Sequence, residues 1–274
     1  MTQPVPAVPP ATAATYVFAV CRHADDDVLC RLPGISTAPV RTLPFEQLHA
    51  VVQDVPVAEA DRQFWTERLS DPDELERYVR AHHQIVTAVA TAGPAAPMAL
   101  ATLYSSEERA RQALTADAAR FHTVLDRVAG RVEWGVKVYV SSASAMAETV
   151  RTVAPARVPQ APGAGRAYLE RVRGTHRARE ESRSAALQAA EELDAALRSL
   201  AVAARRLRLQ EQQLNDCRRV QVLNGAYLVD ESQTARFTKA VATLRRRAGA
   251  LIELSGPWVP PYSFAGEDGA HGDH

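Results

Sequence analysis

Residues 131–140, with the sequence RVEWGVKVYV, alternate between apolar and other side chains along their whole length. One set of alternate positions is entirely apolar: Val132, Trp134, Val136, Val138 and Val140. The other set includes Arg131, Glu133, Lys137 and Tyr139. Because successive side chains of a strand point to opposite faces, this period of two predicts a β-strand with one buried face. It is the clearest strand of the chain, so the fold includes a sheet.

A long helix is predicted downstream of this strand. Three prolines mark a connection after it: Pro155, Pro159 and Pro162. The helix is then expected over residues 165–214, where apolar residues step by four and three for about three heptads. These positions are Ala186, Ala190, Leu193, Leu197, Leu200, Ala204 and Leu207. Such a seam serves either internal packing or a coiled-coil-like partner site, and both readings stay open.

The remaining segments complete a recognisable order. Asn224-Gly225 lies between two apolar runs in residues 220–229, which predicts a β-hairpin because both turn residues tolerate positive φ. Asp230 predicts the start of a helix that Gly249 ends, and residues 251–255 predict a last strand. The order β-α-β-β-α-β indicates a ferredoxin-like domain over residues 130–264, with an unusually long first helix.

The first half predicts a second domain, of mixed α and β structure, over residues 15–129. Strands are expected at residues 16–20, 40–43, 48–55 and 97–104. Asp71-Pro72 with Glu74 predicts a capped helix that runs to about residue 92, with His82 on its buried side and His83 facing outward. Ser105 to Glu108 predicts a second capped start, for helices through residue 129. The fold class is therefore α+β with two domains, and the Pro/Ala-rich residues 1–14 and residues 265–274 are expected to be disordered tails.

Charge and composition limit the functional classes. The 274 residues carry 32 basic and 32 acidic side chains, so the chain lacks the positive field typical of nucleic-acid-binding domains. No basic residue precedes Arg22 and no apolar core of a signal peptide is present, so a cytoplasmic protein is expected. Residues 84–106 are uncharged, but Gly93, Pro94 and Pro97 interrupt them, which argues against a membrane span.

Chemistry-bearing motifs are missing from the sequence. The signatures of phosphate-binding loops, dinucleotide sites, serine nucleophiles and zinc proteases do not occur. Cys21, Cys30 and Cys217 have no metal-ligand spacing, and adjacent His82 and His83 cannot grip one metal from a helix. We therefore predict no catalytic residue, no metal and no cofactor.

Several stretches together resemble the gas vesicle protein L/F family (GvpL/GvpF). Residues 132–138 look like the family's Glu-Trp-Gly-Val-Lys-Val strand, and residues 165–169 are similar to its Gly-Arg-Ala-Tyr-Leu helix start. Residues 254–264 are similar to its terminal Gly-Pro-Trp-Pro-Pro-Tyr-Ser-Phe motif. The likeness covers roughly residues 15–264. Two positions depart from it: Ala99 stands where an arginine is expected, and Val259 interrupts the terminal motif.

The resemblance implies a non-enzymatic accessory or minor structural protein of gas vesicles, located in the cytoplasm at the vesicle. Its implied partners are the small hydrophobic shell protein and other gas vesicle proteins, and self-association is a further possibility. Candidate partner contacts are Trp134, Leu193, Leu197, Leu200, Trp258, Tyr262 and Phe264. Each of these residues also suits an ordinary core. The resemblance does not separate F from L members, nor a resident of the mature vesicle from an assembly helper.

Two other functional classes remain as alternatives. The arginine runs at residues 205–208, 218–219 and 245–247 suit a nucleic-acid-binding module, whose affinity would fall steeply with salt. An enzyme on a ferredoxin-like scaffold is the other alternative, because that fold hosts many unrelated activities.

Overall fold

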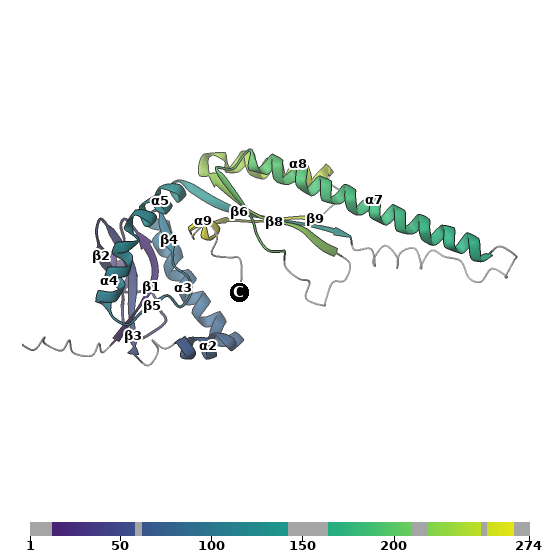
Figure 1. The fold of residues 1–274 in the computed structure, drawn as a ribbon. Coiled ribbons are helices and arrows are strands. Elements are labelled where there is room, and N and C mark those ends of the chain that lie inside the picture. Colours follow the sequence, from purple (N-terminus) through teal and green to yellow (C-terminus); the bar gives the residue numbers. More distant parts are fainter. Residues whose placement is uncertain (1–12, 58–61, 142–163, 210–218, 248–250, 266–274) are drawn as a thin grey trace, which may run out of the picture. The chain divides into compact units, whose positions relative to one another are not determined.

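The computed structural model describes residues 13–57, 62–141, 164–209, 219–247 and 251–265 (Figure 1). Most of both predicted tails, the three connecting prolines, Cys217 and Gly249 lie outside these ranges. The chain divides into two compact units. The described part of the first unit comprises residues 13–131 and 258–265, and the second unit comprises residues 132–257. Residues 258–264 thus belong with the first unit, whereas the sequence interpretation assigned them to the second.

The first unit contains one antiparallel sheet with the strand order β2-β3-β1-β4, and β5 pairs with β1. Its strands are β1 (Ala13–Cys21), β2 (Val40–Phe45), β3 (Leu48–Pro56), β4 (Ala95–Pro97) and β5 (Leu103–Tyr104). Its helices are α1 (Asp26–Leu29), α2 (Arg62–Ser70), α3 (Pro72–Ala92), α4 (Glu107–Ala116), α5 (Ala118–Val128) and α9 (Tyr262–Ala265).

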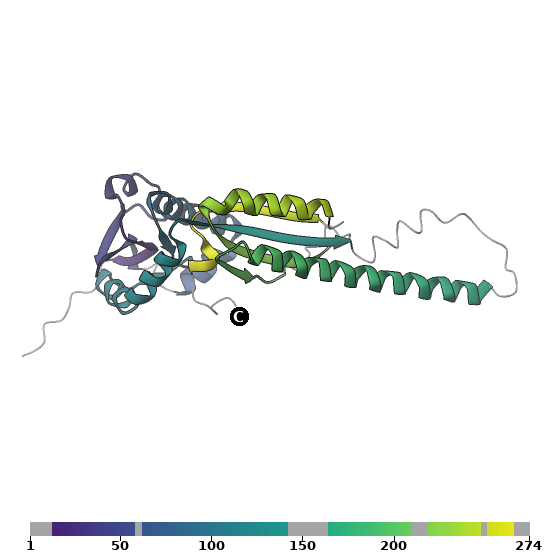
Figure 2. The ribbon, with the colours of Figure 1, turned by 90° about the horizontal axis from the view of Figure 1, so that it is seen from above.

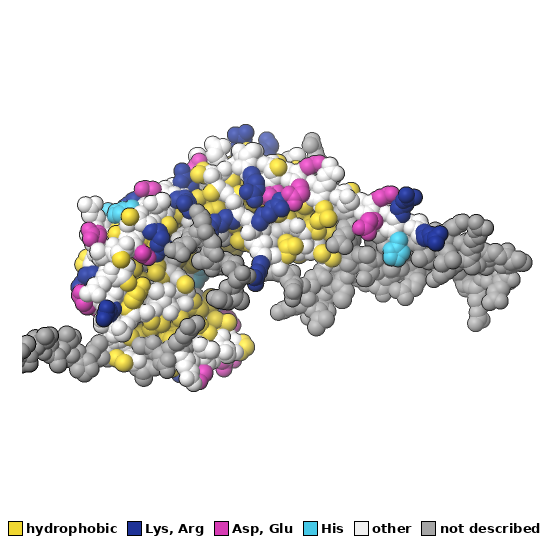
Figure 3. Space-filling model, in the orientation of Figure 1, with side chains coloured by type: hydrophobic (Ala, Val, Ile, Leu, Met, Phe, Trp, Pro, Cys, Tyr) yellow, Lys and Arg dark blue, Asp and Glu magenta, His cyan; other side chains and the backbone are white. Residues whose placement is uncertain are grey.

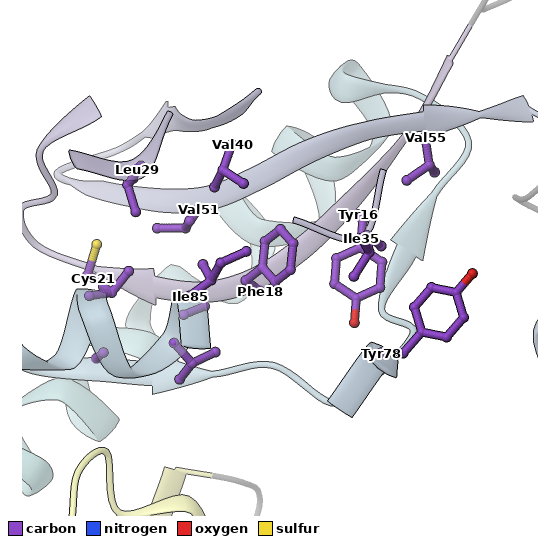
Figure 4. Packing of buried hydrophobic residues seen from close by; sticks show 14 of the residues in the cluster. Tyr16, Phe18, Cys21, Leu29, Ile35, Val40, Val51, Val55, Tyr78 and Ile85 are labelled. Carbon is purple, nitrogen blue, oxygen red and sulfur yellow. The ribbon is translucent and has the colours of Figure 1, made fainter. Parts of the chain in front are cut away.

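Helices cover both faces of this sheet, because its central strands are apolar on both sides. On one face, Tyr16 and Phe18 of β1 lie against Ile85 and Tyr78 of α3 (Figure 4). On the other face, alternate residues of β1 and β3 contact α4 and α5. A bulge between Val17 and Ala19 shifts the alternation within β1. The unit therefore has three layers, helix on sheet on helix.

The second unit is a four-stranded sheet with the order β7-β8-β6-β9 and two helices. Its elements are β6 (Arg131–Ser141), α7 (Ala164–Arg198), β7 (Ala203–Arg206), β8 (Arg219–Asp230), a 3₁₀ turn (Glu231–Gln233), α8 (Thr234–Arg247) and β9 (Leu251–Trp258). Helices α7 and α8 run side by side over the sheet (Figure 2). The apolar side of β6, with Trp134 and Val136, is buried beneath them, as the alternation predicts.

Several predicted elements are confirmed. Strands β1, β2, β3, β6 and β9 occur where they are expected, with ends that differ by a few residues. The side chain of Asp71 accepts hydrogen bonds from the backbone N–H groups of Asp73 and Glu74, and Pro72 begins α3. A capping side chain thus starts this helix, as the sequence indicates.

The predicted hairpin at Asn224-Gly225 is wrong, because both residues lie inside the continuous strand β8. The Asn224 carbonyl accepts from Leu207 N–H, and its side-chain amide donates to the Arg208 carbonyl at 2.6 Å. Gly225 pairs with Arg206. Contacts with a distant segment therefore override the local turn signal.

The predicted end of the long helix at residue 214 is also wrong, since α7 ends at Arg198. Ala204, assigned to the helical seam, lies in β7 and pairs with Tyr227 of β8. Residues 203–206 form a strand because they hydrogen-bond to the edge of β8. Their apolar spacing is compatible with either a helix or a strand.

Three smaller predictions need correction. The strand expected at residues 97–104 is instead two short strands, β4, which ends at Pro97, and β5, and in the turn between them Ala101 has φ 62°. Helix α4 begins one residue later than expected, and the hydroxyl of Ser106 accepts from Arg109 N–H. Leu75 and Val79, assigned to the buried stripe of α3, are exposed at its flank.

Candidate partner-binding surface

Residues 258–265, which start at the last residue of β9, are anchored to the first unit and still expose apolar side chains. Phe264 and Ala265 are buried, and α9 contacts α5 and β4. In the same segment Trp258 is 45% exposed, Val259 37% and Tyr262 37%. The peptide bonds before Pro257 and Pro260 are cis. A segment that is anchored by buried residues and presents large apolar groups to solvent is typical of a contact surface.

Tyr262 is attached to α3 through His83. Its hydroxyl lies 2.8 Å from Nδ1 of His83, and the two rings stack with centroids 5.7 Å apart. Burial raises the pKa of Tyr262 to about 12, so the phenol is neutral at physiological pH. The orientation of the Tyr262 ring is therefore set by contacts within the first unit.

Apolar residues continue from this contact along one flank of α3. Leu75, Val79 and His83 follow one another at intervals of four residues, so they lie one above the other on the helix. Hydrophobic side chains gather on the first unit over the region of α2 and α3 (Figure 3). We define the α3–α9 surface as the exposed or half-exposed side chains of Leu75, Val79, His83, Trp258, Val259 and Tyr262.

The structure separates the seven predicted contact residues into two sets. Trp134, Leu193 and Leu197 are buried in the core of the second unit, and Leu200 is partly buried beside them. Phe264 is buried in the first unit, whereas Trp258 and Tyr262 are exposed there. Of the seven predicted contacts, Trp258 and Tyr262 are thus the ones that reach solvent.

The sequence interpretation missed the α3 side of this surface. It assigned Leu75 and Val79 to the helix core, and it treated His83 only as outward-facing. Their position on the helix could have indicated this surface. The three residues lie at the edge of the apolar stripe of α3, where a side chain contacts either the protein core or a binding partner.

Buried titratable groups in both units serve the fold. Burial lowers the pKa of His82 to about 4, so this imidazole is neutral at physiological pH. In the second unit, burial acts to raise the pKa of Asp194, but hydrogen bonds from Tyr227, Arg198 and Arg206 outweigh it and lower the pKa. Asp194 thus links α7 to β7 and β8 as a carboxylate.

These groups do not gather into a metal site in the described part of the chain. No three histidine, cysteine or acidic side chains there lie close enough to hold a metal ion. Among the arginines proposed to bind nucleic acid, Arg206 pairs with Glu191 and Asp194, and Arg245 donates to a backbone carbonyl. None of the described helices combines the length and apolar character that a membrane span requires.

Comparisons with known proteins agree over most of the chain. The model of a family described as gas vesicle synthesis protein GvpL/GvpF matches residues 14–266. Gas vesicle protein L of Streptomyces sp. (strain CB03234) is 36% identical over 251 residues, which cover 92% of each chain.

Two crystal structures share the fold. GvpF from Anabaena sp. PCC7120 aligns with a TM-score of 0.62 at 14% identity, over 96% of this chain and 100% of that one. GvpF from Microcystis aeruginosa aligns with the same score and identity, over 94% and 100%. At this identity the likeness concerns architecture, a mixed α/β fold with antiparallel sheets.

Proposed function

The chain belongs to the GvpL/GvpF family of gas vesicle synthesis proteins, and from this premise we propose that it assists vesicle assembly by binding the hydrophobic shell protein. It works through protein contacts without catalysis, in the cytoplasm at the growing vesicle, together with other gas vesicle proteins. The observation that carries this proposal is the anchored but exposed terminal segment with Trp258 and Tyr262.

The α3–α9 surface supplies the contact. Shell subunits expose apolar strand and helix surface before they assemble, and such surface aggregates unless it is covered. Trp258 and Tyr262 offer large rings that lose little conformational entropy on binding, and Val79 extends the apolar area along α3. The buried candidates have a structural part in this proposal. Trp134, Leu193 and Leu197 pack in the core of the second unit, and Phe264 is buried in the first unit.

We further assign the second unit to the ferredoxin-like folds. Its elements follow the order β-α-β-β-α-β, and its second and third strands, β7 and β8, pair antiparallel. The strand order β7-β8-β6-β9 places the first and third strands together at the centre of the sheet, and both helices lie on one face. The N-terminal mixed α/β unit is then a separate domain, completed by residues 258–265.

Co-purification tests the function. The chain and the small shell protein are co-expressed, and the recovered complex is compared between wild type, a Trp258→Ser and Val79→Ser double variant, and a Val28→Ser control. Val28 is equally exposed but lies on α1, away from the α3–α9 surface. We expect the double variant to lose at least tenfold of the complex while its melting temperature stays unchanged. Equal recovery from all three chains would contradict the proposed surface, and no complex with wild type would contradict the function.

A further inference from the structure

The outer edge of β9 is open in the described part of the second unit. This strand lies at one end of the order β7-β8-β6-β9, so only β6 pairs with it. An edge strand presents unpaired N–H and C=O groups that another strand can use.

One of these edge groups is occupied by a side chain. Nε of Arg245, on α8, donates a hydrogen bond to the Ile252 carbonyl at 2.9 Å. The Ile252 side chain is buried in the core of the unit, which fixes this residue in the sheet. The guanidinium therefore takes the place that the N–H of an added strand would occupy. A single side-chain hydrogen bond contributes little net free energy, so an incoming backbone can displace it.

A shallow, open depression lies over the same residues. A hollow of about 530 Å³ is lined by Arg245, Leu251, Ile252, Glu253 and Leu254. Leu251 is 39% exposed, and Glu253 is exposed as well. The hydroxyl of Tyr139, on the neighbouring strand β6, hydrogen-bonds to the Glu253 carboxylate.

We propose that the β9 edge binds an extended segment of another protein as a fifth strand, which displaces Arg245 from the Ile252 carbonyl. The chemistry of the edge defines the segment. A basic residue lies opposite Glu253, because opposite charges on neighbouring strands stabilise the pair, and apolar residues flank it against Leu251 and Leu254. This site belongs to the second unit and does not depend on the α3–α9 surface.

A second copy of this chain fits the edge less well. Antiparallel pairing of β9 with itself about Glu253 would bring two carboxylates directly opposite each other, which is destabilising. The occupant is therefore a strand of different sequence, with positive charge at its centre.

A labelled peptide tests the proposal with the full chain. The probe has nine residues of alternating valine and threonine with a central lysine, and fluorescence anisotropy measures its affinity. We expect binding to weaken at least tenfold when glutamate replaces the lysine, and to vanish when the backbone amides that face β9 are N-methylated. Glu253→Lys should invert the lysine preference.

Two arginine variants of α8 test whether the peptide displaces Arg245 or whether its affinity depends only on the positive charge of the helix. Arg245→Ala should tighten peptide binding roughly threefold to tenfold, because no hydrogen bond has to be broken first. Arg236→Ala, which removes another exposed arginine of α8, should leave the affinity unchanged. Circular dichroism checks that each variant is folded, and Arg245→Gln replaces Arg245→Ala if the latter is not.

Three results would overturn the proposal. They are absence of peptide binding by both wild type and folded Arg245 variants, binding that is insensitive to N-methylation, and concentration-dependent dimerisation of Arg245→Ala in light scattering. The last result would assign the edge to a second copy of the chain.

Discussion

The hydroxyl oxygen of Tyr16 lies 2.9 Å from Nδ1 of His82 and also accepts a hydrogen bond from the backbone N–H of Ala101 at 3.1 Å. The Met98 backbone also hydrogen-bonds to the His82 ring. One buried chain of hydrogen bonds thus joins β1, α3 and the turn between β4 and β5.

Replacing Tyr16 by phenylalanine tests this chain. The change leaves the Ala101 N–H and His82 Nδ1 without their partner in a buried site, so we expect the free energy of unfolding to fall by about 1–3 kcal/mol. Urea denaturation measures the loss. Tyr104→Phe is the control, since Tyr104 is only half-buried, and it should change stability by less than about 0.5 kcal/mol. Equal effects of the two changes would show that the hydrogen bonds contribute nothing.

Acid should destabilise the first unit through His82. Its pKa is lowered from 6.5 to about 4, so between these pH values the unfolded chain binds a proton that the folded chain does not. Stability attributable to His82 is therefore complete above pH 6.5 and is lost as the pH falls towards 4, by up to about 3 kcal/mol. Urea denaturation at several pH values, compared between wild type and His82→Asn, isolates this contribution. If NMR shows that the His82 imidazole itself titrates near pH 6.5 in the folded protein, the predicted loss of stability in acid is contradicted.

Alanine substitutions at two glycines test whether a positive φ angle strains the backbone. Gly130 has φ 65° and Gly93 has an extended backbone, and a Cβ at either position would meet no atom within 4 Å. Gly130→Ala should cost about 1 kcal/mol, because an L-residue is disfavoured in the left-handed region. Gly93→Ala should be neutral or stabilise by up to about 1 kcal/mol, since it restricts the unfolded chain. Thermal denaturation measures the melting temperature of both variants. Equal changes in melting temperature would contradict the prediction that an alanine is strained at position 130.

Asp194 should be essential to the second unit. Its carboxylate accepts from Tyr227 at 2.6 Å, from Arg198 at 2.9 Å and from Arg206 at 2.8 Å, and only 4% of its side chain is exposed. Asp194→Ala leaves the buried Tyr227 hydroxyl and two half-exposed arginines without their acceptor, and we expect a loss of about 1–3 kcal/mol. Glu192→Ala, two residues earlier and exposed, should cost less than about 0.5 kcal/mol in the same denaturation experiment. A loss below 1 kcal/mol for Asp194→Ala would contradict the proposed role.

Local patterns predicted the elements whose cause is local. The alternation around Trp134 gave β6 and its buried face, and the Asp71-Pro72 cap gave the start of α3. The sequence proposed the terminal aromatic residues together as partner contacts, and it did not tell buried Phe264 from exposed Trp258 and Tyr262. Whether those two bind a partner stays a prediction.

The failures share a physical cause. Asn224-Gly225 would turn in an isolated peptide, but Leu207 and Arg208, which directly follow β7, hydrogen-bond to Asn224. Gly225 is needed there for a different reason, since a Cβ would lie 2.8 Å from the Tyr227 hydroxyl that reaches Asp194. Pairing partners more than a dozen residues away decide such positions, and a single sequence does not display them.

The division of the first unit between two stretches of sequence has a consequence for synthesis. A ribosome makes residues 13–131 first, then the whole second unit, and only afterwards residues 258–265. Until Phe264 and Ala265 emerge, the nascent first unit exposes the apolar area on α5 and β4 that α9 covers. Translation therefore delivers the last buried side chains of the first unit together with Trp258 and Tyr262, so the unit is completed at the moment its exposed aromatic residues appear.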